Sequence, residues 1–340
     1  MTRGPGAYVF VVLLLARPGL AAPCSPAGDL GIDLAEQAHC DPLVPERCLL
    51  PLPNDYFTVA ARETKTRRRV AFTVEGLPKN VGGTPLDAAE LSTLDGFSPG
   101  SALLLWMPTA DLARSGAPPI TDIGRSLQVD SPIVVVDTRS GRRWPLWAEL
   151  DMNAPAENRA LIVRPATNFL EGHHYVVAVR RLVDGNGDAL PPSPAFAAYR
   201  DGTCTTDATF EKRRRHMESL FATLRRAGVA RADLQLAWDF TIASGDAIAG
   251  RMLSMRDDAF ARLGPRAPVF TVTSVQENPA PEFRRRIRGT FEVPLYLTGD
   301  GGPGQRFALD ANGRPQRQAH PYVATFTCNL PQHASAPARM

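Results

Sequence analysis

The chain has 340 residues, which corresponds to about two domains at roughly 150 residues each. Its composition, with 44% hydrophobic and 21% charged residues, is typical of a protein with packed cores and excludes a wholly disordered chain. The chain has 38 Lys and Arg residues against 35 Asp and Glu residues. This balance is not that of a protein that binds nucleic acid through its phosphates.

The N-terminus, residues 1–22, has the pattern of a secretory signal peptide. Arg3 supplies the positive charge, residues 7–16 form an apolar core that is too short to span a bilayer, and small residues follow it. We therefore expect a protein that is secreted or periplasmic after cleavage. A lipoprotein anchor is the less favoured alternative, because Pro23 separates Cys24 from the small residues. No later stretch is apolar for long enough to predict a transmembrane span.

Export permits disulfide bonds between the five cysteines. Cys40 and Cys48 enclose a short loop stiffened by Pro42 and Pro45, so we predict that they form a disulfide within a Pro- and Cys-rich N-terminal segment, residues 23–68. A zinc site in this segment is the competing interpretation, and the absence of a C-x-x-C pair disfavours it. The pairing of the other three cysteines stays open, and at least one of them is free or bonded outside this chain. They are Cys24, Cys204 and Cys328.

The region that follows, residues 69–202, has short apolar runs separated by turn residues, a pattern typical of a β-sandwich. Within it, residues 160–190 are predicted to form two strands that are separated by Pro165-Ala166 and by a turn at Gly172, and a Gly-rich hairpin tip follows the second strand. This order resembles the closing strands of bacterial immunoglobulin-like domains, which implies an immunoglobulin-like β-domain here. We predict strands at residues 70–74, 102–107, 132–137, 144–150, 160–164 and 174–180.

The remainder is predicted to be a helical linker segment with one strand, residues 203–265, then a second β-region, residues 266–330, and a disordered end, residues 331–340. Apolar residues at helical spacing predict a helix over 207–227, and Ser244 caps a second helix. The fold class is therefore mainly β with a helical insert. Further strands are predicted at residues 234–242, 269–275, 287–297, 306–309 and 322–328.

Ser98 is the one serine in a G-x-S-x-G pattern, the nucleophile elbow of serine hydrolases. We reject it as a nucleophile for two reasons. The elbow needs a strand before the serine and a helix after it, whereas a predicted strand follows here. The next residue, Pro99, has no backbone N–H to donate to an oxyanion. We identify no other catalytic residue.

The histidines and acidic turns give no stronger site. His173 and His174 lie where a loop enters a strand, and a solvated turn is preferred to a metal ligand or a general base; an enzyme that uses one of them with a metal is the minor alternative. His216 is expected to be exposed on the basic side of its helix. The turn Asp184–Asp188 resembles the start of a calcium loop without its Gly and Glu, so we predict a hairpin tip and leave weak calcium binding open. No metal or cofactor is predicted.

Three further segments resemble a known group. The residues Leu50-Pro-Leu-Pro-Asn-Asp-Tyr56 and Leu94-Asp-Gly-Phe-Ser98, with the immunoglobulin-like run and residues 236–241, resemble the N-terminal region of secreted bacterial lipases and esterases, including the virulence-factor lipase group. The resemblance implies that an α/β-hydrolase catalytic domain is the partner of this region. No residue here matches the catalytic residues of that family.

Two functions are therefore in competition. The first is the non-catalytic N-terminal region of a secreted serine esterase or lipase, packed against an α/β-hydrolase catalytic domain that is absent from this chain. The second is a stand-alone exported binding or adhesion protein built from immunoglobulin-like domains. The sequence predicts neither a substrate nor an oligomeric state.

Overall fold

The computed structural model describes residue 1 and residues 31–333. The predicted signal peptide, Cys24 and most of the predicted disordered end lie outside the described residues. The strands are β1 (Thr58–Ala60), β2 (Arg68–Val70), β3 (Leu103–Trp106), β4 (Ile133–Asp137), β5 (Leu146–Leu150), β6 (Ala160–Pro165), β7 (His174–Arg180), β8 (Leu234–Thr241), β9 (Phe270–Ala280), β10 (Phe283–Pro294) and β11 (Pro321–Pro331). The helices are α1 (Ala88–Leu91), α2 (Pro194–Asp201), α3 (Ala208–Arg226) and α4 (Gly245–Leu263), with short 3₁₀ helices η1 (Asp55–Phe57), η2 (Ile120–Leu127), η3 (Ala156–Asn158) and η4 (Arg231–Asp233).

The protein is mainly β, as predicted. Within the described residues the strands form four antiparallel sheets, in the orders β1-β2, β3-β6-β5, β4-β7-β8 and β11-β10-β9. The predicted strand at residues 234–242 is β8, and it pairs along its length with β7. The segment placed in a helical linker therefore contributes a strand to the sheet of the preceding β-region.

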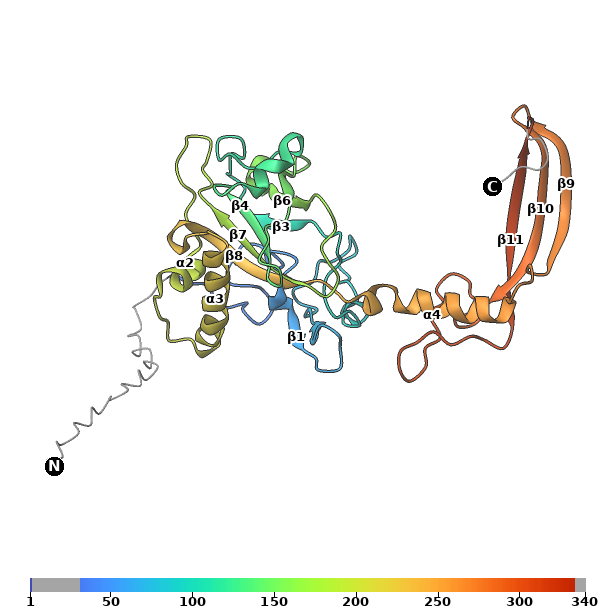
Figure 1. Cartoon of the computed structure of the whole chain (residues 1–340), viewed down its shortest axis with the longest axis horizontal. Helices are drawn as coiled ribbons and strands as arrows, with labels where there is room; N and C mark the ends of the chain where they lie inside the picture. Colours follow the sequence, from blue (N-terminus) through green and yellow to red (C-terminus); the bar gives the residue numbers. More distant parts are fainter. Residues whose placement is uncertain (2–30, 334–340) are drawn as a thin grey trace.

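The sheet β4-β7-β8 is the centre of the main core. Every residue of β8 is buried, and β4 is buried throughout, so both faces of these strands are covered. Helices α2 and α3 pack against this sheet (Figure 1). The apolar face predicted for α3 is confirmed: Phe210, Met217, Leu220, Phe221 and Leu224 are all buried.

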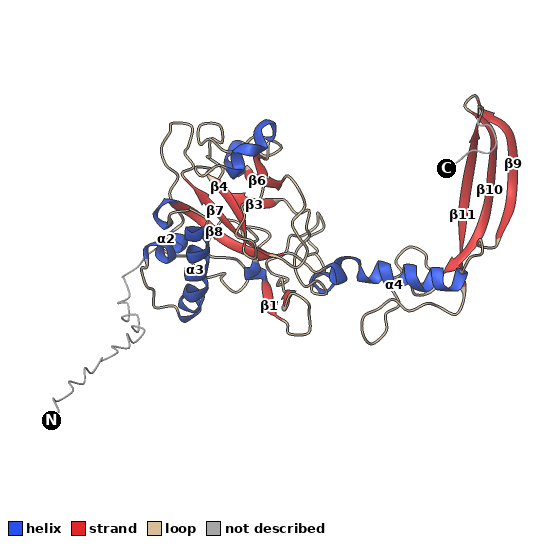
Figure 2. Ribbon diagram, viewed as in Figure 1, coloured by secondary structure: helices blue, strands red, loops and turns tan. Residues whose placement is uncertain are grey.

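The C-terminal part has a different character. Helix α4 leads away from the main core, and the sheet β9-β10-β11 stands at its far end (Figure 2). Ser244 caps α4 as predicted, because its hydroxyl accepts the N–H of Ala247. None of the described side chains of α4 is buried. No helix among the described residues combines the length and the apolar character needed to cross a membrane.

Some elements differ from the prediction. Of the strand predicted at residues 70–74, only Val70 lies in a strand, because β2 ends there. Residues 306–309 form isolated β-bridges with residues 297 and 315 instead of a strand, because the turns on either side leave them no strand to pair with. Helix α2 was not predicted, although Ser193 caps it and Pro194 occupies its first turn, a favourable start for a helix. The turn-forming residues Pro191, Pro192 and Ser193 directly before it favoured the prediction of a loop.

The cysteines follow the prediction for the N-terminal loop. Cys40 and Cys48 form a disulfide. Cys204 is buried and disulfide-bonded, and Cys328 is a free, exposed thiol.

Replacing both Cys40 and Cys48 by Ser should lower the free energy of unfolding by about 2–3 kcal/mol, the value expected for opening so short a loop. Urea denaturation of the variant and of the wild-type protein measures this. An unchanged midpoint would show that the loop keeps its shape without the bond.

Candidate functional site

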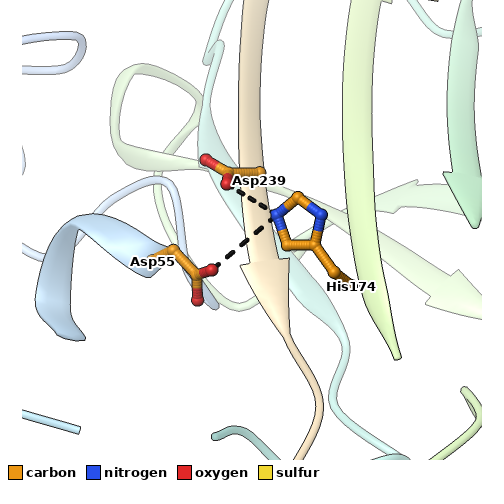
Figure 3. A group of neighbouring side chains, drawn as sticks. All are labelled: Asp55, His174 and Asp239. Atoms are coloured by element: carbon orange, nitrogen blue, oxygen red, sulfur yellow. Dashed lines mark hydrogen bonds and ion pairs between the residues drawn. The ribbon is translucent and has the colours of Figure 1, made fainter. Parts of the chain in front are cut away.

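The centre of the candidate site is Asp239, a charged residue in the fully buried strand β8. Its side chain is 2% exposed. One carboxylate oxygen accepts a hydrogen bond from His174 Nε2 at 2.7 Å (Figure 3). The other accepts one from His216 Nε2 at 2.8 Å. Burying a carboxylate is unfavourable unless it is paired, and here two imidazoles provide the pairing.

The register of the sheet brings these groups together. His174 is the first residue of β7 and pairs with Thr241, while Val176 pairs with Asp239. Paired residues of antiparallel strands share a face, so His174, Asp239 and Thr241 project from the same face of the sheet. Helix α3 packs on β7 and β8, which places His216 over that face.

Asp55 approaches the same face from the N-terminal segment. One oxygen accepts the backbone N–H of Thr241 at 2.9 Å, and the other accepts the hydroxyl of Thr241 at 2.7 Å. Arg68 Nε lies 2.9 Å from that second oxygen, and His174 Nε2 lies 3.8 Å from it. Through these hydrogen bonds, Asp55 attaches the segment of residues 50–56 to the C-terminal end of β8.

Electrostatics in this cluster is set by burial and by the two adjacent carboxylates. Burial and the negative charge of Asp239 raise the pKa of Asp55, against the opposing effect of Arg68. Burial by itself would also raise the pKa of Asp239, but the hydrogen bonds from His174 and His216 outweigh burial, so the pKa of Asp239 is lowered. Burial alone would lower the pKa of His174; the hydrogen bond and charge of Asp239, with the charge of Asp55, raise it instead.

A cavity of about 440 Å³ opens beside the cluster. Asp55, His216 and Asp239 form part of its wall, together with Arg68 and Lys212. The buried carboxylates are therefore within reach of a small molecule or ion that enters the cavity.

A second ion pair fixes the wall of this cavity. Arg213 of α3 donates to both oxygens of Asp41, at 2.6 and 2.9 Å. Asp41 is fully buried and also accepts hydrogen bonds from Asn54 and from the N–H of Leu43. Because Asp41 directly follows Cys40, the disulfide-closed loop is tied to α3.

The neighbouring motif at residues 94–98 has a structural role. Asp95 is 3% exposed, and its carboxylate accepts both the backbone N–H and the hydroxyl of Ser244, at 2.9 and 2.8 Å. Gly96 allows the chain to run directly beside the end of β8, since a methyl group there would lie 2.6 Å from the backbone nitrogen of Ala243.

His173 and His174 lie where a loop enters β7, as predicted, but the solvated environment expected for the histidines was wrong. His174 lies in β7 and is hydrogen-bonded to Asp239, so it is not a solvated turn residue. His173 is also partly buried, with Nδ1 3.1 Å from an oxygen of Asp137. His216, expected to be exposed, is half-buried against Asp239.

The other candidates lie apart from this cluster. Ser98 sits in a turn before β3, where its hydroxyl accepts the N–H of Gly100. Asp184 accepts the N–H groups of Asn186 and Asp188 within a hairpin turn. Sequence reasoning missed Asp55 and Asp239 as site residues. The available signal was a lone Asp inside the apolar strand at residues 234–242, because an isolated charge in a core strand requires partners.

Three side chains of the cluster have the chemistry of metal ligands. Asp55, His174 and Asp239 each offer one ligand atom, and these atoms lie within 4.8 Å of one another. Imidazole nitrogen and carboxylate oxygen are ligands that Zn²⁺ accepts.

Comparisons with models of known protein families, with curated proteins and with solved structures find no match.

Replacing Asp239 by Ala should lower the free energy of unfolding by about 1–3 kcal/mol, because it removes the acceptor of two hydrogen bonds from partly buried imidazoles. Asp257→Ala is the matched control: Asp257 is exposed and paired with Arg256, so its loss should cost less than about 1 kcal/mol. Chemical denaturation measures both values. Equal effects of the two substitutions would contradict a stabilising role of the cluster.

Replacing Gly96 by Ala should destabilise the protein by about 1–3 kcal/mol, because the added methyl group collides with the backbone at the end of β8. Gly100→Ala provides the comparison. The added methyl group would lie 3.6 Å from Oδ1 of Asn168, which is an ordinary van der Waals distance. Thermal melts of both variants measure the difference. If the Gly96→Ala and wild-type proteins had the same melting temperature, residue 96 would not lie as close to the backbone of Ala243 as the structure shows.

Proposed function

We propose that this chain is the non-catalytic N-terminal region of a secreted serine esterase or lipase, and that its C-terminal part binds an α/β-hydrolase catalytic domain. The motifs at residues 50–56 and 94–98 support the family, and the disulfide is compatible with export. The observation that carries the docking role is one face of the sheet β9-β10-β11.

That face is apolar across all three strands. The register pairs Phe291 with Phe270 on one side and with Ala324 on the other, and Gly289 with Val272 and Phe326. Paired residues share a face, and so does every second residue of a strand. A register shift in β9 between the pairs of Arg288 and Gly289 brings both Val272 and Val275 to the same face, so one surface collects the apolar side chains. This apolar sheet face consists of Phe270, Val272, Val275, Ile287, Phe291, Val293, Tyr322, Ala324, Phe326 and Cys328.

The opposite face of the same sheet is polar. It carries Arg286, Arg288, Thr290, Glu292, Thr325 and Thr327, with Val323 as an apolar exception. A sheet with one apolar and one polar face is stable when a second layer covers the apolar side. Within the described residues no such layer is present, and Phe270, Val272 and Val275 are 62%, 46% and 53% exposed.

The apolar surface continues onto helix α4. A pocket of about 360 Å³ lies where the helix meets the sheet, and Met252, Met255, Leu295 and Tyr322 contribute to its wall. Met252 and Phe260 of α4 are 62% and 64% exposed. An exposed apolar surface that spans a helix and a sheet is a feature of protein–protein interfaces.

A folded domain suits this surface better than a peptide does. The surface is wide, because it crosses three strands and continues onto a helix, whereas a peptide strand or helix occupies a single edge or groove. Covering a large apolar side chain stabilises a complex by up to about 1.5–3 kcal/mol before the costs of association are subtracted. The stand-alone binding or adhesion protein remains the second candidate, and it needs no permanent partner for this face.

The first test is the size of the native product in the exported fraction of the producing cell, measured by immunoblot. We expect a band far above 36.8 kDa that hydrolyses a p-nitrophenyl ester after purification. A band slightly below that mass, without esterase activity in any co-purifying protein, would refute the hydrolase proposal and favour the stand-alone protein.

Cys328 then reports on docking, because it is an exposed thiol on the apolar sheet face. Its reaction with a maleimide should be at least tenfold slower in the large product than in the isolated chain. Val272→Asp should restore fast labelling, whereas Thr271→Asp, on the opposite face of the same strand, should not. Fast labelling of Cys328 in the wild-type product would place the catalytic domain elsewhere.

A further inference from the structure

We propose that His174, Asp239 and Asp55 bind one divalent transition-metal ion, with Zn²⁺ as the best match, beside the cavity that adjoins them. This inference is independent of the proposed docking function. It rests on the placement of the three ligand atoms, on the side chains that orient them and on the space next to them.

The ligand atoms are spaced for a small ion. His174 Nε2 lies 2.7 Å from the nearer Asp239 oxygen and 3.8 Å from the nearer Asp55 oxygen. A tetrahedral Zn²⁺ with bonds of about 2.0–2.2 Å holds its ligand atoms about 3.3 Å apart. The two distances lie on either side of this value, and all three ligand atoms lie within 4.8 Å of one another. Adjustment of the side chains would therefore complete the coordination.

Each ligand is held by a rigid element and by a second contact. The other ring nitrogen of His174 lies 3.3 Å from the hydroxyl of Thr138, which leaves Nε2 directed at the carboxylates. His216 holds the second oxygen of Asp239, and the N–H of Thr241 holds the first oxygen of Asp55. Such outer contacts are characteristic of metal ligands, because they fix the orientation of the ligand and its protonated nitrogen.

The charges also suit a divalent ion. Asp55 and Asp239, each with a side chain 2% exposed, place two carboxylates beside His174. His216 also contacts Asp239, and Arg68 also pairs with Asp55. An ion with two positive charges balances both carboxylates when it is bound through a neutral histidine. The soft ligands that favour other metals are absent from this cluster, and one nitrogen with two oxygens is a combination that Zn²⁺ accepts.

Asp55 is the ligand that must exchange a contact. Its second oxygen accepts the hydroxyl of Thr241 and pairs with Arg68, so it must release one of them to bind an ion. Arg68 is the side chain with room to move, because it is 31% exposed and lines the cavity. Its movement would leave Thr241 to hold the carboxylate in place.

The fourth coordination position would face the cavity. Three protein ligands with one open position towards solvent are typical of zinc sites that act on a bound water or ligand. The cavity of about 440 Å³ has Lys212 and Arg68 on its wall, so a bound water or an anion would complete the coordination there.

The test uses the full chain after treatment with a chelator, followed by calorimetric titration with ZnCl₂. We expect one equivalent of Zn²⁺ to bind with a Kd in the micromolar range or below. Co²⁺ in its place should give visible absorption bands of a four-coordinate site. His174→Ala should weaken Zn²⁺ binding at least 100-fold, and Asp55→Asn, which preserves the shape of the side chain, should weaken it at least tenfold.

His173→Ala is the matched control. His173 is adjacent in sequence and partly buried, but its ring pairs with Asp137 instead of the cluster. Its removal should change Zn²⁺ affinity by less than threefold. No binding by the wild-type protein, or equal affinity of the His174→Ala and wild-type proteins, would overturn the proposal, because the second result assigns binding to surface histidines. Circular dichroism of each variant establishes that it is folded, and Asp55→Asn keeps the test decisive where His174→Ala unfolds.

Discussion

A carboxylate buried away from water costs several kcal/mol unless its oxygens are hydrogen-bonded. Three such carboxylates lie in or next to the C-terminal half of β8 and the residues that follow it. Asp239 lies within the strand, Asp55 contacts Thr241 at its end, and Asp95 contacts Ser244 three residues later. Each carboxylate uses both oxygens. The loops that carry Asp55 and Asp95 are therefore held at the end of β8 by hydrogen bonds to the N–H groups and hydroxyls of Thr241 and Ser244.

This constraint gives a physical meaning to the two short motifs that carry the family resemblance. In both, an Asp accepts the backbone N–H and the hydroxyl of a single Thr or Ser next to β8. In the second motif, Gly96 provides the close approach that the contact needs. The motifs therefore specify how the N-terminal segments attach to the central sheet. Both contacts hold N-terminal segments to the strand and to the residue that caps α4.

The sequence predicted what depends on local pattern and missed what depends on contacts between distant segments. The strands β3 to β8, helix α3 and the Ser244 cap were predicted because periodicity and capping residues are local signals. The cluster joins Asp55, His174, His216 and Asp239, which lie in four separate segments, and nothing near His174 in the sequence indicates an acid on the next strand. Likewise, the apolar sheet face emerges only from the register of three strands.

Helix α4 connects the main core to the sheet β9-β10-β11 (Figure 1). Helix α4 begins at Ser244, whose N–H and hydroxyl are held by Asp95, so the direction in which α4 leaves the core is set where β8 ends. The apolar sheet face stands at the far end of that helix (Figure 1). A rotation of α4 about its first turn would carry the whole face with it. The buried carboxylates next to β8 therefore determine both the polar cavity of the core and the direction in which the apolar sheet face is presented to a partner.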